Sequence, residues 1–105
     1  MARKPLDKTE IEEGVRAEVL NMPHQWRAFF KSVAVEVCEV TCPQFPGRPV
    51  FVVARSDDRA VFYDDVEEDF GIGSFDGQAR LKDCGLIGEL QFALIALQGG
   101  QKART

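Results

Sequence analysis

The chain has 105 residues, of which 45% are hydrophobic and 29% charged, the balance of a folded domain rather than a disordered or fibrous chain. This length predicts one domain spanning 1–105, with flexible ends at 1–8 and 99–105, and excludes a second lobe. The net charge is −4, and the segment 57–89 alone carries ten acidic and three basic residues, a charge of −7. Because such a field repels phosphate, it argues against a nucleic-acid partner and favours a basic protein partner.

The amino terminus and the cysteines indicate the compartment. The opening sequence MARKPLDKTEIEEG lacks the apolar run of a secretory signal. No apolar stretch reaches the ~18 residues of a membrane span. These features predict a cytoplasmic protein with no membrane partner. An odd number of cysteines, at Cys38, Cys42 and Cys84, predicts free thiols rather than a disulfide framework.

Two helices are expected in the first 40 residues. Thr9 followed by Glu12 matches a capping box, and apolar residues then recur every four positions, which predicts a helix over 9–20. A second helix is expected to begin near Pro23 and to run to 40. Its apolar stripe consists of Trp26, Phe29, Phe30, Val33, Val37 and Val40. The β-branched sequence VAVEVCEV at 33–40 leaves a strand as the alternative.

A loop with three prolines, PQFPGRP, precedes a series of short extended segments. Strands are predicted at 50–54, 60–64, 70–75 and 78–82, with a hairpin turn at Asp76–Gly77. Helical spacing returns over 86–97. The expected fold is α+β: two helices, a four-stranded antiparallel meander and a third helix, with the helices packed on one face of the sheet and the other face wetter. Gly71 and Gly73 leave one face of their strand without side chains, which predicts a close approach by an internal helix or, as the alternative, by a partner.

Several short motifs resemble catalytic or metal sites but lack the required context. Asp69-Phe70-Gly71 matches the magnesium-binding tripeptide of protein kinases, without the other kinase motifs. Asp65, Glu67 and Asp69 have calcium-loop spacing, but the glycine and glutamate that complete such a loop are missing. His24 is the only histidine. We therefore expect no enzymatic activity, no cofactor and no metal site.

The remaining signal is a concentration of carboxylates that would repel one another unless a cationic partner binds there. Tyr63, beside them, and Phe45, in the proline-rich loop, are the expected aromatic anchors. The predicted partner-binding residues are Asp57, Asp58, Asp64, Asp65, Glu67, Glu68 and Asp69, with Tyr63 and Phe45. The alternative is a structural or regulatory domain that self-associates, as a homodimer for example, through its sheet or its glycine-faced strand, with the acids serving as a solubilising face.

The stretch VFYDDVEEDFGIGSFDGQARLKDCGLIGELQFAL, residues 61–94, resembles a pattern in small uncharacterised bacterial proteins, some of which are immunity proteins of toxin systems. The resemblance rests on an acidic strand and loop, a glycine-rich hairpin and a terminal helix. It implies a cytoplasmic, non-enzymatic inhibitor that blocks a cognate toxin, commonly a basic nuclease, by masking its active site. The acidic residues named above would carry that interaction.

Overall fold

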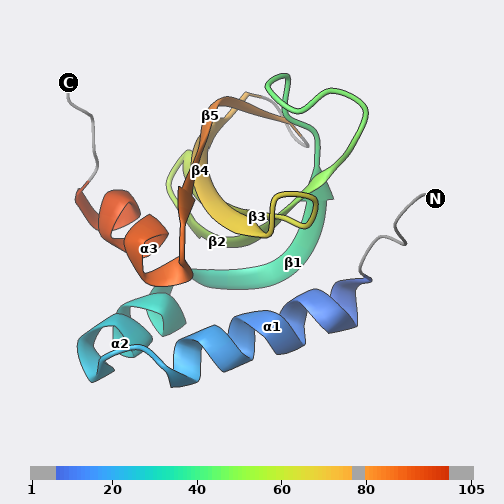
Figure 1. Ribbon diagram of the computed structural model, residues 1–105. Coiled ribbons are helices and arrows are strands. Elements are labelled where there is room, and N and C mark those ends of the chain that lie inside the picture. Colours follow the sequence, from blue (N-terminus) through green and yellow to red (C-terminus); the bar gives the residue numbers. More distant parts are fainter. Residues whose placement is uncertain (1–6, 77–79, 100–105) are drawn as a thin grey trace.

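The computed structural model describes residues 7–76 and 80–99. It confirms the α+β class with an antiparallel meander, but the sheet has five strands rather than four (Figure 1). The elements are α1 (Lys8–Leu20), α2 (His24–Val33), β1 (Ala34–Val40), β2 (Val50–Ser56), β3 (Arg59–Asp64), β4 (Asp69–Phe75), β5 (Leu81–Gly88) and α3 (Leu90–Gly99). The predicted flexible ends lie almost entirely outside the described residues.

The fifth strand comes from the segment 33–40, where the predicted helix is wrong beyond Val33. Helix α2 ends there, Ala34 is already extended, and Cys38 pairs with Val52 of β2. Val37 packs with the helices whereas Val40 joins the opposite cluster. The spacing of Val33, Val37 and Val40 fits one face of a helix, and it also fits a strand whose register is interrupted. Periodicity alone therefore could not distinguish a helix from a strand here. The β-branched content and the available partner strand favour the strand.

The sheet curls on itself, and both of its faces are apolar (Figure 1). Thr41, just after β1, forms a parallel bridge with Arg80, just before β5, so the two outer strands meet at one end. The expectation of a wetter second face is therefore wrong, because curling turns that face into an enclosed core. The buried members of this inner cluster are Val40, Cys42, Val50, Val52, Ala60, Phe62 and Leu81.

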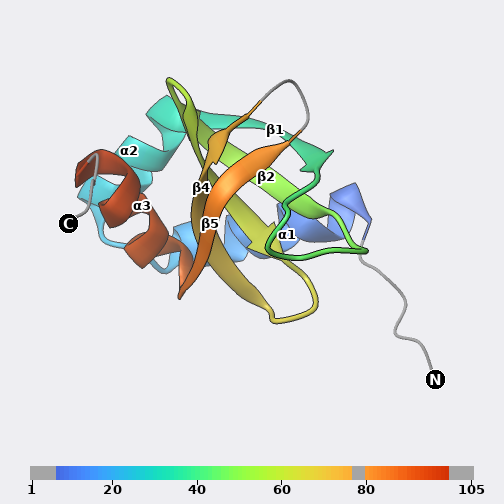
Figure 2. The same ribbon diagram turned by 90° about the horizontal axis from the view of Figure 1, so that it is seen from above.

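The three helices contribute to the cluster on the outer face of the sheet. Ile11 and Val15 of α1 pack there with residues of β2, β3 and β4. Leu90 and Leu94 of α3 join the same cluster, and α2 adds partly buried aromatic residues. Viewed from above, α2 and α3 lie together at one end of the sheet (Figure 2). Helix α3 contacts β3 and β4, and α1 contributes to the same cluster beside these two strands.

The glycine face of β4 is approached closely from within the chain, but by strand β5 and a phenylalanine ring rather than by the expected helix. A Cβ on Gly71 would collide with the carbonyl oxygen of Gly85 and lie 2.7 Å from Cζ of Phe62. A Cβ on Gly73 would lie 3.0 Å from Sγ of Cys84. Strand β5 and the Phe62 ring occupy the space that side chains on β4 would need. This face is internal and is not available to a partner.

Other boundaries shift by a few residues. The amino-terminal cap of α1 is Asp7, which forms the capping box with Glu10 in place of the expected Thr9 and Glu12. Of the predicted strand at 78–82, residues 78–79 lie outside the described residues. Strand β5 covers Leu81–Gly88, beyond the expected end at 82, so the last helix begins at Leu90 rather than at 86. In the predicted hairpin turn, Gly77 lies outside the described residues. The backbone N–H of Asp76 donates to the Arg80 carbonyl at 2.8 Å, so the two sides of the turn are paired.

The expectation of three free thiols is wrong for two of the cysteines. Cys42 and Cys84 form a disulfide across a sequence separation of 42 residues, and Cys38 remains an exposed free thiol. The bond connects the loop after β1 to the middle of β5, beside the Thr41–Arg80 bridge. Counting cysteines could not reveal this pair, because the curl of the sheet brings the two segments together.

Candidate functional site

The structure divides the predicted acidic residues into buried and exposed groups. Asp64 has no exposed surface and Asp65 is 6% exposed. Nε and Nη2 of Arg48 donate to the two carboxylate oxygens of Asp64 at 3.2 and 2.5 Å. This hydrogen bond raises the pKa of Arg48 above its ordinary value. Asp64 therefore holds the structure together and is not a surface for a partner.

The exposed acidic residues lie at opposite ends of β3. Asp57 and Asp58 form the turn between β2 and β3, whereas Glu67 and Glu68 belong to the turn between β3 and β4. The six residues of β3 separate the two turns by about 20 Å, since an extended strand rises ~3.4 Å per residue. The predicted residues therefore do not form one continuous acidic surface.

The two predicted aromatic anchors are both partly buried. Phe45 packs against the inner cluster, with its ring centroid 6.0 Å from that of Phe62 and the Arg48 guanidinium 5.0 Å from its own centroid. Tyr63 packs against Phe70 on the outer side of the sheet, with ring centroids 4.9 Å apart. Phe45 secures the loop after β1, whereas Tyr63 faces a pocket.

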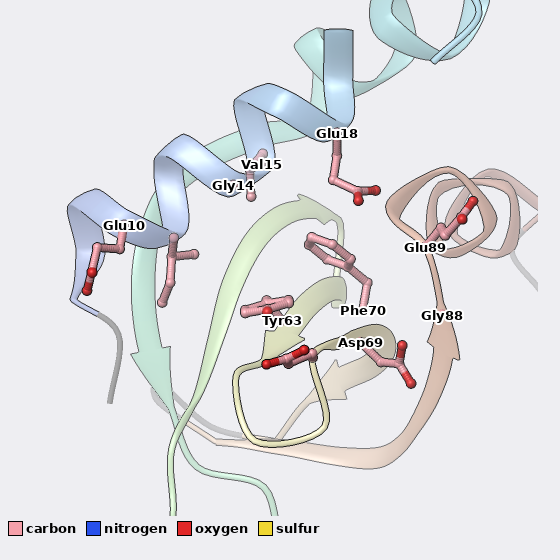
Figure 3. Close-up of a pocket in the computed structure, with 11 residues that line it drawn as sticks. Glu10, Gly14, Val15, Glu18, Tyr63, Asp69, Phe70, Gly88 and Glu89 are labelled. Carbon is pink, nitrogen blue, oxygen red and sulfur yellow. The ribbon is translucent and has the colours of Figure 1, made fainter. Parts of the chain in front are cut away.

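This acidic pocket, of about 280 Å³, lies between α1, the turn after β3 and the junction of β5 with α3 (Figure 3). The rings of Tyr63 and Phe70 lie side by side beneath α1, with Gly14 and Val15 above them (Figure 3). Gly14 leaves open space here, because a Cβ on it would contact nothing within 4 Å. The lining residues are Glu10, Ile11, Gly14, Val15, Glu18, Tyr63, Glu68, Asp69, Phe70, Gly88 and Glu89.

Carboxylates surround the aromatic floor of the acidic pocket. Five of its lining residues are acidic and none is basic. Glu10 accepts a hydrogen bond from the Asp7 backbone, and Glu18 accepts one from the Leu90 backbone at 3.3 Å, so these two also cap α1 and α3. Asp69 and Glu89 come from the opposite wall. The pocket thus combines apolar rings with negative charge, an environment that suits an organic cation.

The carboxylates are spread around the pocket rather than directed at one point. Within 7–76 and 80–99, no three His, Cys, Asp or Glu side chains are grouped so that they could hold a metal ion. In the same part of the chain, no helix is long and apolar enough to cross a membrane.

Sequence reasoning identified one wall of the acidic pocket. Tyr63, Glu68 and Asp69 were predicted, but Glu10 and Glu18 were not. A signal for them existed, because Glu10, Gly14 and Glu18 recur every four residues and share a helix face. Glu89 and Phe70 had no comparable signal, because only the packing of α1 over β3 and β4 makes them neighbours of that face.

No protein-family model, no curated protein and no solved structure matches this chain. The acidic pocket is therefore the feature of the molecule that bears on its function.

Proposed function

We propose that this chain is a small, non-enzymatic binding domain that recognises a basic protein by seating a cationic side chain in the acidic pocket. The observation that carries the proposal is that five acidic residues and no basic residue line the pocket together with Tyr63 and Phe70. Charge around the pocket would steer a basic partner and disfavour acidic ones. The aromatic floor would supply the contact area that exposed charges alone lack.

Arginine is the side chain that fits this chemistry best. Its planar guanidinium stacks on aromatic rings and can donate to carboxylates in the same plane. A lysine ammonium has the same charge but is a compact, strongly hydrated group that gains less from ring stacking. We expect the partner to present at least one exposed arginine at the centre of its interface.

An inhibitor of immunity type is the biological role that we propose for such a domain. Binding through a basic surface would cover the region where a nuclease toxin holds its nucleic-acid substrate. Inhibition would follow from occlusion, and no bond would be made or broken. The partner in this role is a cytoplasmic basic protein.

The acidic pocket can be tested by removing two charges from it. The double variant Asp69→Asn/Glu89→Gln keeps the side-chain shapes and leaves the capping residues Glu10 and Glu18 intact. Binding of a fluorescein-labelled peptide with four arginines alternating with glycines is measured by anisotropy. We expect the affinity to fall about fivefold to tenfold, which corresponds to about 1–1.4 kcal/mol.

The matched control is Asp57→Asn/Asp58→Asn, which removes the same charge from the far end of β3. We expect this control to change the affinity less than about twofold, because only long-range attraction is lost. Equal effects of the two double variants would refute the acidic pocket as the binding site and would leave only a general charge effect.

Self-association is a second candidate function, favoured by the outer face of α3. Phe92 and Ile95 are 52% and 41% exposed there, and α3 contains no charged residue. Self-association through this face would give a mass that rises with concentration in sedimentation experiments. The variant Phe92→Glu would abolish that rise, whereas a mass independent of concentration would rule out this candidate.

A further inference from the structure

The loop between β1 and β2, residues 41–49, is attached to the rest of the fold at both of its ends. At one end, the disulfide from Cys42 fixes it to Cys84 of β5, and Gln44 Oε1 accepts a hydrogen bond from the Cys84 backbone at 3.4 Å. At the other end, Arg48 holds both oxygens of Asp64. Phe45, between them, packs on the inner cluster. The loop thus connects β5 to the start of the turn after β3.

Asp64 in turn organises the turn 64–69. Its carboxylate accepts a hydrogen bond from the Val66 backbone at 3.0 Å, and its carbonyl accepts one from the Glu68 backbone at 2.8 Å. Glu68 has a positive φ of 61°, a conformation that a non-glycine residue adopts only when its surroundings hold it. The turn ends at Asp69, so both Glu68 and Asp69 of the acidic pocket depend on its shape.

We infer that the Cys42–Cys84 disulfide is a redox latch that controls the turn 64–69 and, through it, one wall of the acidic pocket. This inference rests on the proposed function for its biological meaning. Reduction by a dithiol would transfer two electrons and two protons, giving the Cys42 and Cys84 thiols and the oxidised dithiol. Closure would require the reverse exchange with a disulfide oxidant. In a reducing cytosol the reduced form, with two thiols, would prevail, and oxidation would restore the Cys42–Cys84 disulfide.

The consequence of opening is local. Once the disulfide is broken, the loop loses its covalent attachment to β5 and keeps only non-covalent contacts, among them the Gln44–Cys84 hydrogen bond, the packing of Phe45 and the Arg48–Asp64 pair. Ordering the loop around Arg48 then loses more conformational entropy. The Arg48–Asp64 ion pair then breaks more often, and the turn 64–69 loses its ordered conformation when the pair is broken. The α1 wall of the pocket keeps its position, because Glu10 and Glu18 are held by helix caps.

The test measures amide hydrogen exchange of Val66 and Glu68, whose N–H groups both donate to Asp64. The full chain carries Cys38→Ser, which removes the exposed free thiol and prevents exchange with the disulfide. It is compared oxidised and after reduction with dithiothreitol, with Met22 in the turn after α1 as the internal control. We expect reduction to accelerate exchange at Val66 and Glu68 about fivefold or more and to leave Met22 unchanged.

A second variant separates the latch from a general loosening of the fold. Arg48→Lys in the oxidised protein keeps the counter-charge of Asp64 but loses the two-point contact of the guanidinium. It should accelerate exchange at Val66 and Glu68 but not at Met22, and reduction should then add little, because both changes act through one connection. Unchanged exchange on reduction, or an equal acceleration at Met22, would overturn the latch. So would full additivity of reduction and Arg48→Lys.

The arginine peptide gives an independent readout on the same samples. If the latch and the proposed function both hold, the reduced protein binds the peptide about fivefold more weakly or worse. If exchange responds but the peptide binds neither form, the latch stands and the proposed function has failed. If the peptide binds both forms equally and exchange does not respond, the latch has failed and the proposed function stands.

Discussion

Among single residues, Asp64 differs from the exposed acidic residues because it forms a buried ion pair that stabilises the fold. Its carboxylate is fully buried, and Arg48 is its cationic partner. We expect Arg48→Gln to lower the free energy of unfolding by about 3–5 kcal/mol, because it leaves a buried carboxylate without its counter-charge. Urea denaturation followed by circular dichroism measures the loss.

The control for this prediction is Asp58→Asn, which changes an exposed carboxylate at the other end of β3. We expect it to change the free energy of unfolding by less than about 0.5 kcal/mol. Arg48→Gln and Asp58→Asn with the same urea midpoint would contradict a structural role for the Asp64 pair.

Two glycines on neighbouring strands differ sharply in what surrounds them. A methyl group on Gly71 would strike the Gly85 carbonyl and the Phe62 ring, whereas a Cβ on Gly85 would meet nothing within 4 Å. Gly71→Ala should therefore destabilise the domain by more than about 3 kcal/mol, because backbone and a buried ring must both move. Gly85→Ala should leave stability within about 1 kcal/mol of the wild type. Thermal denaturation compares the two, and similar melting temperatures would refute this account of the curl.

At the scale of elements, α1 is connected to β1 by an exposed ion pair between Lys8 and Glu36. The hydrogen bond from Lys8 lowers the pKa of Glu36 below its ordinary value of about 4.5. A lowered pKa means that the pair stabilises the fold above that ordinary value and that its contribution is lost as the pH falls through the lowered value. Because both side chains are exposed, the contribution is small.

Lys8→Met should return the pKa of Glu36 toward its ordinary value and remove this acid sensitivity. The carboxyl titration is followed by carbon-detected NMR. The control is Arg16→Met, an equal change of charge elsewhere on α1, which should leave the Glu36 titration in place. An unshifted Glu36 titration in Lys8→Met would show that the pair is not formed in solution.

The elements also show what local sequence can determine. The first helix, the strand at 60–64 and the last helix were predictable, because each has a single consistent period or clear turn residues at its ends. The segment 33–40 was not, since Val33, Val37 and Val40 fit a helical stripe and only pairing with β2 makes them a strand. The continuation of β5 beyond Gly85 failed for a related reason, because glycine reads as a break although β4 provides a partner there.

At the scale of the whole molecule, the curl of the sheet explains most of what the sequence did not reveal. It gives the domain a second core, brings Cys42 to Cys84 and buries Asp64 under the loop that carries Arg48. Charge counting correctly located the acidic segment but could not distinguish a buried carboxylate from an exposed one. The acidic pocket joins residues far apart in the chain, Glu10 and Glu89 among them, so only three of its eleven lining residues, Tyr63, Glu68 and Asp69, were predicted.

The proposed function requires the acidic pocket to bind an arginine side chain. The most direct test adds N-acetyl-arginine methylamide to the 15N-labelled protein and follows the backbone amides by NMR. The neutral analogue N-acetyl-citrulline methylamide, which keeps the shape and loses the charge, is the control. We predict saturable shifts centred on Gly14, Phe70 and Gly88, with dissociation in the millimolar range that a single side chain supports, about −4 kcal/mol. Shifts centred on Asp57 and Asp58, or equal shifts with citrulline, would contradict the claim.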